Sequence, residues 1–262
     1  MATDQATNQS VEKAATVLSA FLDGRALRVS DVAKHAGLGQ STASRLLSTL
    51  ESLQFVERDP ISSMYQLGPA LLTLAGVAIN QHPVHREARQ AAQNLAGSLG
   101  LGVNVAVRQG SSLFYLCNFE GRLAPKSYTL MGQRNPLHAT GIGKCLLLAL
   151  TPAERRDLVP DLHRYTPRTV CDHDDLDAEL AEVAHRGYAT EIEELALGRS
   201  CVAAPILDQS GQIVAALSIS GPLSALGLAG GDPDLASTVI EVADSISVGL
   251  GYLGPRHTTA QP

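Results

Sequence analysis

The sequence predicts an α+β fold in two parts: a helical N-terminal part closed by a short β-hairpin, and a larger part in which helices flank an antiparallel sheet. Two patterns and the chain length predict it. Apolar residues recur at helical spacing up to residue 53, while strand-like alternation, such as Val103, Val105 and Val107, appears only later. The 262 residues, 45% of them hydrophobic, exceed one domain of typical size, roughly 100 to 200 residues.

Residues 28–56 predict two short helices joined by a glycine-bearing turn. The first runs from Val29 to Ala36 with Ser30 as its N-cap, and Gly37 takes the left-handed conformation that ends a helix. The second carries small polar side chains and one arginine on its outer face, which suits the DNA major groove. The alternative is an ordinary helical hairpin whose outer face is solvated and binds no DNA. The buried face comprises Ala43, Leu46, Leu47, Leu50 and Leu53, and the outer face Ser41, Ser44, Arg45 and Ser48.

Two strand-like runs follow at residues 55–58 and 64–67, with turn-forming residues 59–63 between them. A hairpin here would be the wing of a winged helix-turn-helix, and wings commonly contact the sugar-phosphate backbone. We therefore expect the second helix to read DNA and the wing to hold its phosphates. The predicted DNA-binding residues are Lys34, Gln40, Ser41, Thr42, Ser44, Arg45, Ser48, Arg58, Ser62, Ser63 and Tyr65.

Charge limits the kind of DNA binding. Through Leu67 the chain has six Lys or Arg against seven Asp or Glu, a net charge of −1, and the whole chain carries −6. This balance argues against a protein that coats DNA non-specifically. It is compatible with a sequence-specific DNA-binding protein. In such a protein Lys34, Arg45 and Arg58 would supply positive charge locally, and a dimer would provide two DNA-binding sites.

An apolar helix at residues 70–80 follows the predicted wing. Because it is apolar on so many sides, we expect a connector buried between domains or between subunits, as dimers often require. The amphipathic helix from Val11 to Phe21 supports this expectation.

From Pro83 onward the pattern mixes helices and strands. Helices are expected at residues 84–99 and 176–185. Two more are expected to begin at the capping box of Thr151 and Glu154 and at Asp232. The expected strands lie at 103–107, 113–119, 188–192, 201–207 and 212–220, the last two joined by a hairpin turn at 208–211.

Several classes of protein are disfavoured. The apolar runs are far shorter than the about 20 residues that span a membrane, and the polar N-terminus lacks a secretory signal, so we expect a cytoplasmic chain without a membrane partner. The four cysteines are widely spaced, which favours free thiols. Cys171 and His173 form a pair without a clear second half, so neither a metal nor another cofactor is expected.

Four segments in this order resemble the IclR family of bacterial transcriptional regulators. They are the N-terminal winged helix with GLGQSTASRLL, PLHATGIGK at 136–144, EIEELALGRSCVAAPI at 191–206 and AALSISGP at 215–222. The resemblance implies a winged helix-turn-helix, a linker helix and a GAF-like domain that binds a small metabolite, in a homodimer or a dimer of dimers. The expected boundaries are a disordered arm at 1–9, the DNA-binding domain at 10–68, the linker at 69–82, the effector-binding domain at 83–254 and a disordered tail at 255–262.

The expected effector site combines a glycine-bearing turn with a polar strand. Residues 138–144 precede an apolar helix at 145–150, whose free amide groups would attract a carboxylate; the alternative is a glycine that only permits close packing. A phosphate loop is excluded, because that motif needs glycine and a hydroxyl residue where His138 and Cys145 stand. Ser218 and Ser220 point to one face of their strand, where they could hold a carboxylate. By resemblance, the effector-binding residues are Gly141, Ile142, Glu191, Cys201, Ser218 and Ser220.

Acidic residues near this site carry separate expectations. The position of Glu191 is often aspartate in the family, and a longer buried carboxylate needs a partner or a raised pKa. Glu193, Glu194 and Arg199 are interpreted as loop or interface residues.

These observations favour a regulator without catalytic residues, whose binding to palindromic operator DNA is controlled by a small organic acid. Both a repressor and an activator fit. One alternative is a small hydrolase or transferase with an appended DNA-binding domain, in which Cys201 is the nucleophile and His138 or His173 the base. Another is an architectural or protein-interaction module that has no pocket.

Overall fold

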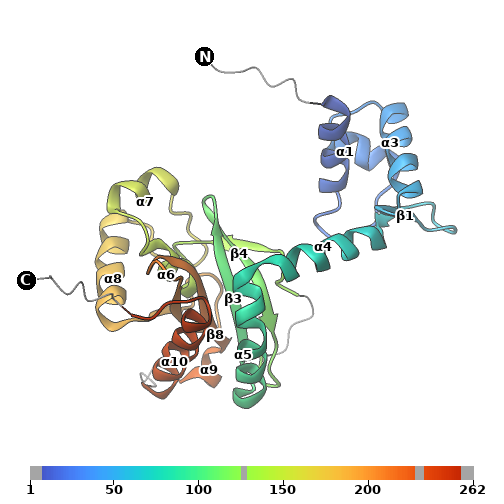
Figure 1. The fold of residues 1–262 in the computed structure, drawn as a ribbon. Helices are drawn as coiled ribbons and strands as arrows, with labels where there is room; N and C mark the ends of the chain where they lie inside the picture. The colour runs from blue at the N-terminus through green and yellow to red at the C-terminus, as the bar shows by residue number, and fades with distance from the viewer. Residues whose placement is uncertain (1–7, 125–128, 228–232, 255–262) are drawn as a thin grey trace, which may run out of the picture. The chain divides into compact units, whose positions relative to one another are not determined.

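The computed structural model describes residues 8–124, 129–227 and 233–254. The chain divides into two compact units, residues 1–79 and 80–262 (Figure 1). The tail expected at 255–262, and residues 1–7 of the expected arm, lie outside the described residues. Helix α1 (Gln9–Ser19) already begins within that arm, because the Asn8 side chain accepts the backbone N–H of Ser10 at 3.0 Å.

The described part of the first unit packs α1, α2 (Val29–His35) and α3 (Gln40–Ser52) around one apolar core. Gly37 ends α2 with a φ of +64°, as predicted. Two details differ from the prediction. Arg28 rather than Ser30 is the N-cap of α2, because the carboxylate of Asp31 accepts the Arg28 N–H at 3.1 Å. Leu53, expected on the buried face, is 55% exposed. The core includes Val17, Phe21, Val32, Leu47 and Leu50.

The predicted wing is present as an antiparallel hairpin of β1 (Val56–Arg58) and β2 (Tyr65–Leu67). Asp59 organises its turn, since one carboxylate oxygen accepts the amides of Ile61 at 3.0 Å and Ser62 at 2.6 Å. The Leu27 N–H donates to the carbonyl oxygen of Tyr65 at 2.9 Å. The hairpin is therefore fixed to the segment that precedes α2.

Helix α4 (Pro69–Gln81) follows the wing, and none of its residues is buried. Leu72, Leu74 and Val77 are 77%, 54% and 53% exposed. Burial of this helix between domains stays a prediction. Exposed apolar surface of this kind is unfavourable in water by about 25 cal/mol per Å². Burial between subunits stays a prediction.

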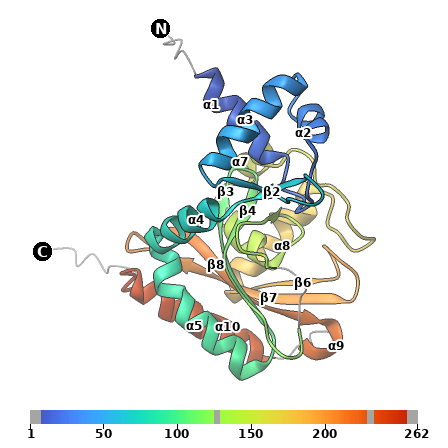
Figure 2. The ribbon, with the colours of Figure 1, turned by 90° about the vertical axis from the view of Figure 1, so that its right-hand side faces the viewer.

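The second unit contains an antiparallel sheet in the order β5-β4-β3-β8-β7-β6. Helices α5 (Pro83–Leu99) and α10 (Pro233–Gly249) lie side by side on one face (Figure 2), and α6 (Gly141–Leu147) packs on the other face. The predicted sheet flanked by helices is confirmed. The strands are β3 (Gly102–Gln109), β4 (Ser112–Phe119), β5 (Arg134–Pro136), β6 (Ala189–Ile192), β7 (Arg199–Leu207) and β8 (Ile213–Pro222).

Three further helices complete the described part of this unit, α7 (Pro152–Leu158), α8 (His173–Arg186) and α9 (Leu223–Leu226). Thr151 and Glu154 form the predicted capping box of α7. Strand β5 and helix α9 were not predicted, because three or four residues carry too little periodicity. No helix within the described ranges has the length and apolar character needed to cross a membrane.

Candidate functional site

A pocket of about 410 Å³ opens in the second unit, between the sheet, the start of α6 and the segment that joins β6 to β7. Five of the six predicted effector-binding residues line it: Ile142, Glu191, Cys201, Ser218 and Ser220. The sixth, Gly141, lies directly behind the wall, since a Cβ atom there would come within 2.9 Å of the Cys201 sulfur. Sequence reasoning missed other lining residues, among them Asn104, Tyr115, Arg134, Asn135, Thr140 and Arg199.

A hydrogen-bonded row of polar side chains crosses the sheet surface that lines the pocket. Asn104 lies opposite Ser218 on one side and Asn118 on the other. Asn118 Nδ2 donates to Asn104 Oδ1 at 2.8 Å, and Asn104 Nδ2 donates to Ser218 Oγ at 3.3 Å and to Ser220 Oγ at 3.0 Å. Asn104 and Ser218 are each 3% exposed. Because buried amides are costly unless they are hydrogen-bonded, this row fixes its members tightly.

Glu191 anchors one wall of the pocket rather than standing free in it. Its Oε1 accepts the backbone N–H of Glu194 at 2.6 Å and that of Leu195 at 3.2 Å. Burial raises the pKa of Glu191, although these hydrogen bonds oppose the shift. Thr169 Oγ1 also donates to the Glu194 carbonyl oxygen at 2.7 Å. The segment after β6 is therefore held at several points.

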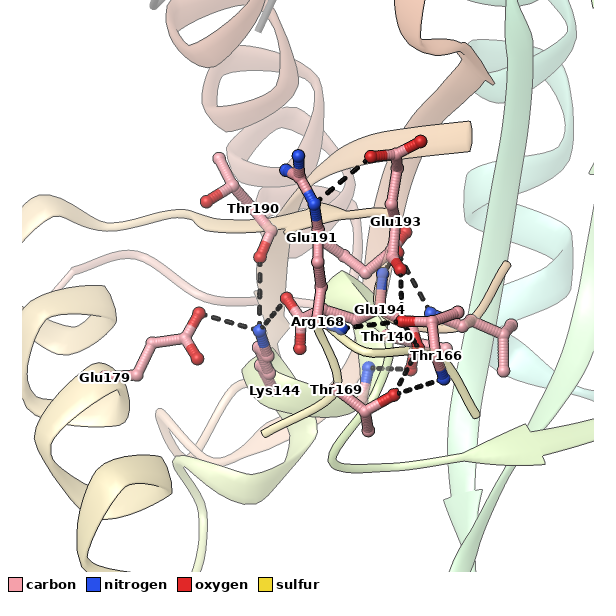
Figure 3. Close-up of polar contacts among 12 residues, drawn as sticks. Thr140, Lys144, Thr166, Arg168, Thr169, Glu179, Thr190, Glu191, Glu193 and Glu194 are labelled. Atoms are coloured by element: carbon pink, nitrogen blue, oxygen red, sulfur yellow. Dashed lines mark hydrogen bonds and ion pairs between the residues drawn. The ribbon is translucent and has the colours of Figure 1, made fainter. Parts of the chain in front are cut away.

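A buried lysine lies beside this wall (Figure 3). Lys144 Nζ donates to Glu194 Oε1 at 2.6 Å and to Glu179 Oε1 at 2.7 Å, and the lysine side chain is fully buried. Burial raises the pKa of Glu194 to about 7, and the charges of Glu179 and Glu191 act in the same direction. Burial alone would lower the pKa of Lys144, but its ion pairs with Glu194 and Glu179 outweigh this effect, so the pKa of Lys144 is raised. Glu194 thus lies in the loop between β6 and β7, as expected, and its carboxylate is buried against Lys144.

The predicted amide groups at the start of the helix after residue 144 are not free. Helix α6 begins at Gly141, not at Cys145, and all of its residues are buried. The Thr140 hydroxyl caps it by accepting the Gly143 N–H at 3.1 Å, and donates to the Pro136 carbonyl oxygen at 2.8 Å. Thr140 and Ile142 still bring the first turn of α6 to the pocket.

The arrangement of Cys201 contradicts the nucleophile hypothesis. Burial raises the pKa of Cys201 well above its ordinary value, and the charge of Glu191 adds to this, whereas a nucleophilic cysteine needs a lowered pKa. Among the described residues that line the pocket there is no histidine. His138 Nε2 instead contacts the carbonyl oxygen of His163 at 3.0 Å, and His173 Nε2 that of Pro160 at 3.4 Å.

Most of the predicted DNA-binding residues lie on the surface of the first unit, with one clear exception. Tyr65 is 5% exposed and belongs to the apolar core, so its prediction as a phosphate contact is wrong. The Ser62 hydroxyl donates to Asp59 at 2.8 Å and thus stabilises the turn of the wing. Thr42 is half-buried. The exposed residues are Lys34, Gln40, Ser41, Ser44, Arg45, Ser48, Arg58, Ser62 and Ser63.

Within the described ranges, no cluster of three or more His, Cys, Asp or Glu side chains is placed to hold a metal ion. All four cysteines are free thiols. Cys171 and His173 are the two residues considered above as metal ligands. The Cys171 thiol donates to the Thr169 carbonyl oxygen at 3.3 Å.

Comparisons with known proteins identify both units. The family model described as "Bacterial transcriptional regulator IclR C-terminal" matches residues 76–248, and the IclR helix-turn-helix domain model matches residues 10–60. The chain belongs to the IclR family of bacterial transcriptional regulators. The glycerol operon regulatory protein of Streptomyces coelicolor is 34% identical over 93% of this chain and 96% of its own length.

Solved structures of IclR-type proteins have the same fold. A putative transcriptional regulator from Rhodococcus sp. RHA1 superposes with a TM-score of 0.84 and 28% identity over 93% of this chain and 98% of that one. An IclR homolog from Microbacterium hydrocarbonoxydans, in complex with 4-hydroxybenzoate, gives a TM-score of 0.81 and 25% identity over 92% and 99%. The relatives are transcriptional regulators, not enzymes, and this chain accordingly has a DNA-binding unit and an effector-binding unit.

Proposed function

We propose that a small organic acid, bound in the pocket of the second unit, controls the binding of this regulator to its operator. The pocket of about 410 Å³ carries the proposal, because it is lined by the hydroxyls of Ser218 and Ser220 and by Arg134 and Arg199. Burial raises the pKa of the Cys201 thiol, which therefore adds no negative charge. Positive charge and hydroxyl groups suit a carboxylate. The 4-hydroxybenzoate complex of the Microbacterium homolog supports an acid by analogy.

We assign operator binding to residues 10–68, the linker to 69–82 and effector binding to 83–254. The exposed side chains of α3 would enter the major groove, and Arg58 and Ser63 of the wing would contact phosphates. The exposed apolar residues of α4 would be covered by a second subunit, in a dimer or a dimer of dimers. Two copies of the reading helix match a palindromic operator, and such a regulator works in the cytoplasm, where bacterial DNA lies.

The control follows from linkage between the two binding reactions. An effector shifts the regulator toward the conformation to which it binds more tightly, by no more than that difference in affinity. If the two conformations differ in the spacing of the reading helices, operator affinity changes with effector concentration. Either direction of the change gives a regulator, so repression and activation are both outcomes of this mechanism.

The test begins with the operator. Genomic fragments captured by the full chain should share a palindromic site, and the adjacent genes should indicate a class of organic acid. A panel of such acids should then raise the thermal unfolding temperature of the full chain and change operator binding. The proposal fails if no acid does both.

Replacement of one pocket residue separates a sensor from an enzyme. Cys201→Ser should shift the effector concentration at half-maximal response while operator binding without effector is kept. A turnover activity that Cys201→Ser abolishes would contradict the sensor.

A further inference from the structure

The row of hydrogen bonds from Asn118 through Asn104 to Ser218 and Ser220 has a fixed direction. The backbone N–H of Leu130 donates to Asn118 Oδ1 at 3.0 Å, and a backbone amide nitrogen is only a donor. The other end of the Asn118 side chain, Nδ2, therefore faces Asn104 and donates to its Oδ1 at 2.8 Å. Because the two ends of an asparagine amide are distinguished by their partners, one backbone donor orients both amides.

This direction determines what the two serines offer to a ligand. A hydroxyl has one hydrogen and two lone pairs, and Asn104 Nδ2 uses a lone pair of Ser218 Oγ at 3.3 Å and of Ser220 Oγ at 3.0 Å. Ser220 Oγ donates its hydrogen to the Gly102 carbonyl oxygen at 3.4 Å, a long hydrogen bond that a closer acceptor can replace. Within the described part of the chain, Ser218 Oγ donates to no acceptor. The Ser218 hydroxyl can therefore donate into the pocket, and the Ser220 hydroxyl can do so when it gives up its long hydrogen bond to Gly102.

We propose that Asn118 and Asn104 are positioning residues that make Ser218 and Ser220 hydrogen-bond donors, so that the pocket selects a carboxylate over the matching carboxamide. This inference rests on the proposed function, since it describes how the same pocket recognises its effector. When the two hydroxyls donate to the two oxygens of a carboxylate, both hydrogen bonds form. A carboxamide has one oxygen, so its NH₂ group meets the second hydroxyl hydrogen to hydrogen. Loss of hydrogen bonds to a charged group corresponds to about tenfold to a hundredfold in affinity.

Asn118 gives the sharper test because it is outside the residues that line the pocket. Asn118→Asp keeps the oxygen that accepts from Leu130 and puts a second oxygen where Nδ2 donated. The Asn104 amide then turns its Nδ2 toward position 118 and its oxygen toward the serines. The serine hydroxyls then donate to that oxygen instead of to a ligand in the pocket. The preference for the acid is therefore lost without any change at Ser218 or Ser220.

The measurement is isothermal titration calorimetry on the full chain with matched pairs of probes: 4-hydroxybenzoate and 4-hydroxybenzamide, lactate and lactamide, pyruvate and pyruvamide. The parent protein should prefer at least one acid to its amide by about tenfold or more. Asn118→Asp should lower this ratio by a similar factor. Asn94→Asp is the matched control, since it adds the same charge at an exposed position of α5 and should leave the ratio unchanged.

A second variant separates orientation from charge. Asn118→Leu has the same branching of heavy atoms and no charge. It removes the hydrogen bond that orients Asn104, so the acid-to-amide ratio should fall in the same direction. Operator binding without effector serves as the check that each variant is folded. An unchanged ratio in both Asn118 variants would overturn the inference and leave the proposed function standing. Failure of every probe to bind the parent protein would instead overturn the proposed function, and this inference with it.

Discussion

The two units of the chain place polar side chains in opposite ways. On α3 of the first unit the polar residues face water, while the core beneath them is apolar. In the second unit Lys144, Asn104, Glu191 and Ser218 are all buried. An exposed polar stripe can meet a partner as large as duplex DNA, whereas buried polar groups around a cavity can meet only a ligand small enough to be enclosed. The arrangement of polarity thus separates the reading of DNA from the sensing of a small molecule.

The same difference predicts that the units fail in different ways. The first unit depends on apolar packing, where loss is graded with the volume removed. The second also depends on buried charges and amides whose partners must all be present. Removal of one partner there leaves another group desolvated and unpaired, so the largest effects are expected in the second unit.

Lys144→Met should have the largest effect on stability. It removes the only side-chain cation that Glu194 and Glu179 contact in the described structure, so both carboxylates lose their ion pair, and Glu194 is 8% exposed. Breaking a buried pair in this way typically lowers the free energy of unfolding by about 3 to 5 kcal/mol. Urea unfolding of the full chain measures it. Lys13→Met, at an exposed position of α1, is the control and should change stability by less than about 0.5 kcal/mol. A loss no larger than that of the control would contradict the role of Lys144.

Leu47→Ala tests whether damage to the first unit stays there. Leu47 is fully buried in the core beneath α3, and its truncation should cost about 2 to 5 kcal/mol. Operator binding should be lost at moderate temperature, while the effector should still stabilise the second unit in thermal unfolding. Leu53→Ala, at a residue that is 55% exposed, should leave operator binding intact. Simultaneous loss of effector binding in Leu47→Ala would show that the units are not energetically separable.

The helices and strands of both units could largely be predicted from sequence, whereas the contacts of the buried polar residues in the second unit could not. The helix-turn-helix and wing are local patterns, in which apolar spacing and the glycine at position 37 determine each turn. Asn104 was missed because alternation along β3 suggested one polar, solvated face. In the structure α5 covers one face and the pocket and α6 cover the other, so alternation no longer distinguishes inside from outside. The ion pair of Lys144 with Glu194 was missed because no spacing rule connects residues on separate elements.

Replacement of Arg45 should weaken operator binding more than replacement of Gln40. Both are exposed on α3, but an arginine donates two hydrogen bonds to a guanine edge or a phosphate and brings a charge. Arg45→Ala should therefore reduce affinity by about tenfold to a hundredfold, corresponding to about 1 to 3 kcal/mol, and Gln40→Ala by less. Fluorescence anisotropy with labelled operator at fixed salt measures both. Equal, unmeasurable effects would mean that a different face of α3 meets the DNA.

The smallest change, no more than about 1.4 kcal/mol for each pH unit, is expected in the pH dependence of stability, and it comes from the crowding of carboxylates around Lys144. Burial raises the pKa of Glu194 to about 7 from an ordinary value of 4.5, with Glu179 and Glu191 nearby adding negative charge. Between these two values the unfolded chain has released this proton and the folded chain has kept it. The folded state then binds more protons, so the free energy of unfolding should fall as the pH rises from about 4.5 to 7 and level off above that. Glu194→Gln should flatten this part of the curve in urea unfolding at closely spaced pH values, because the amide does not titrate. Glu182→Gln, on the exposed side of α8, removes a carboxylate in water and should leave the slope unchanged. If the slope persisted in Glu194→Gln, another member of the cluster would be the group that holds the proton.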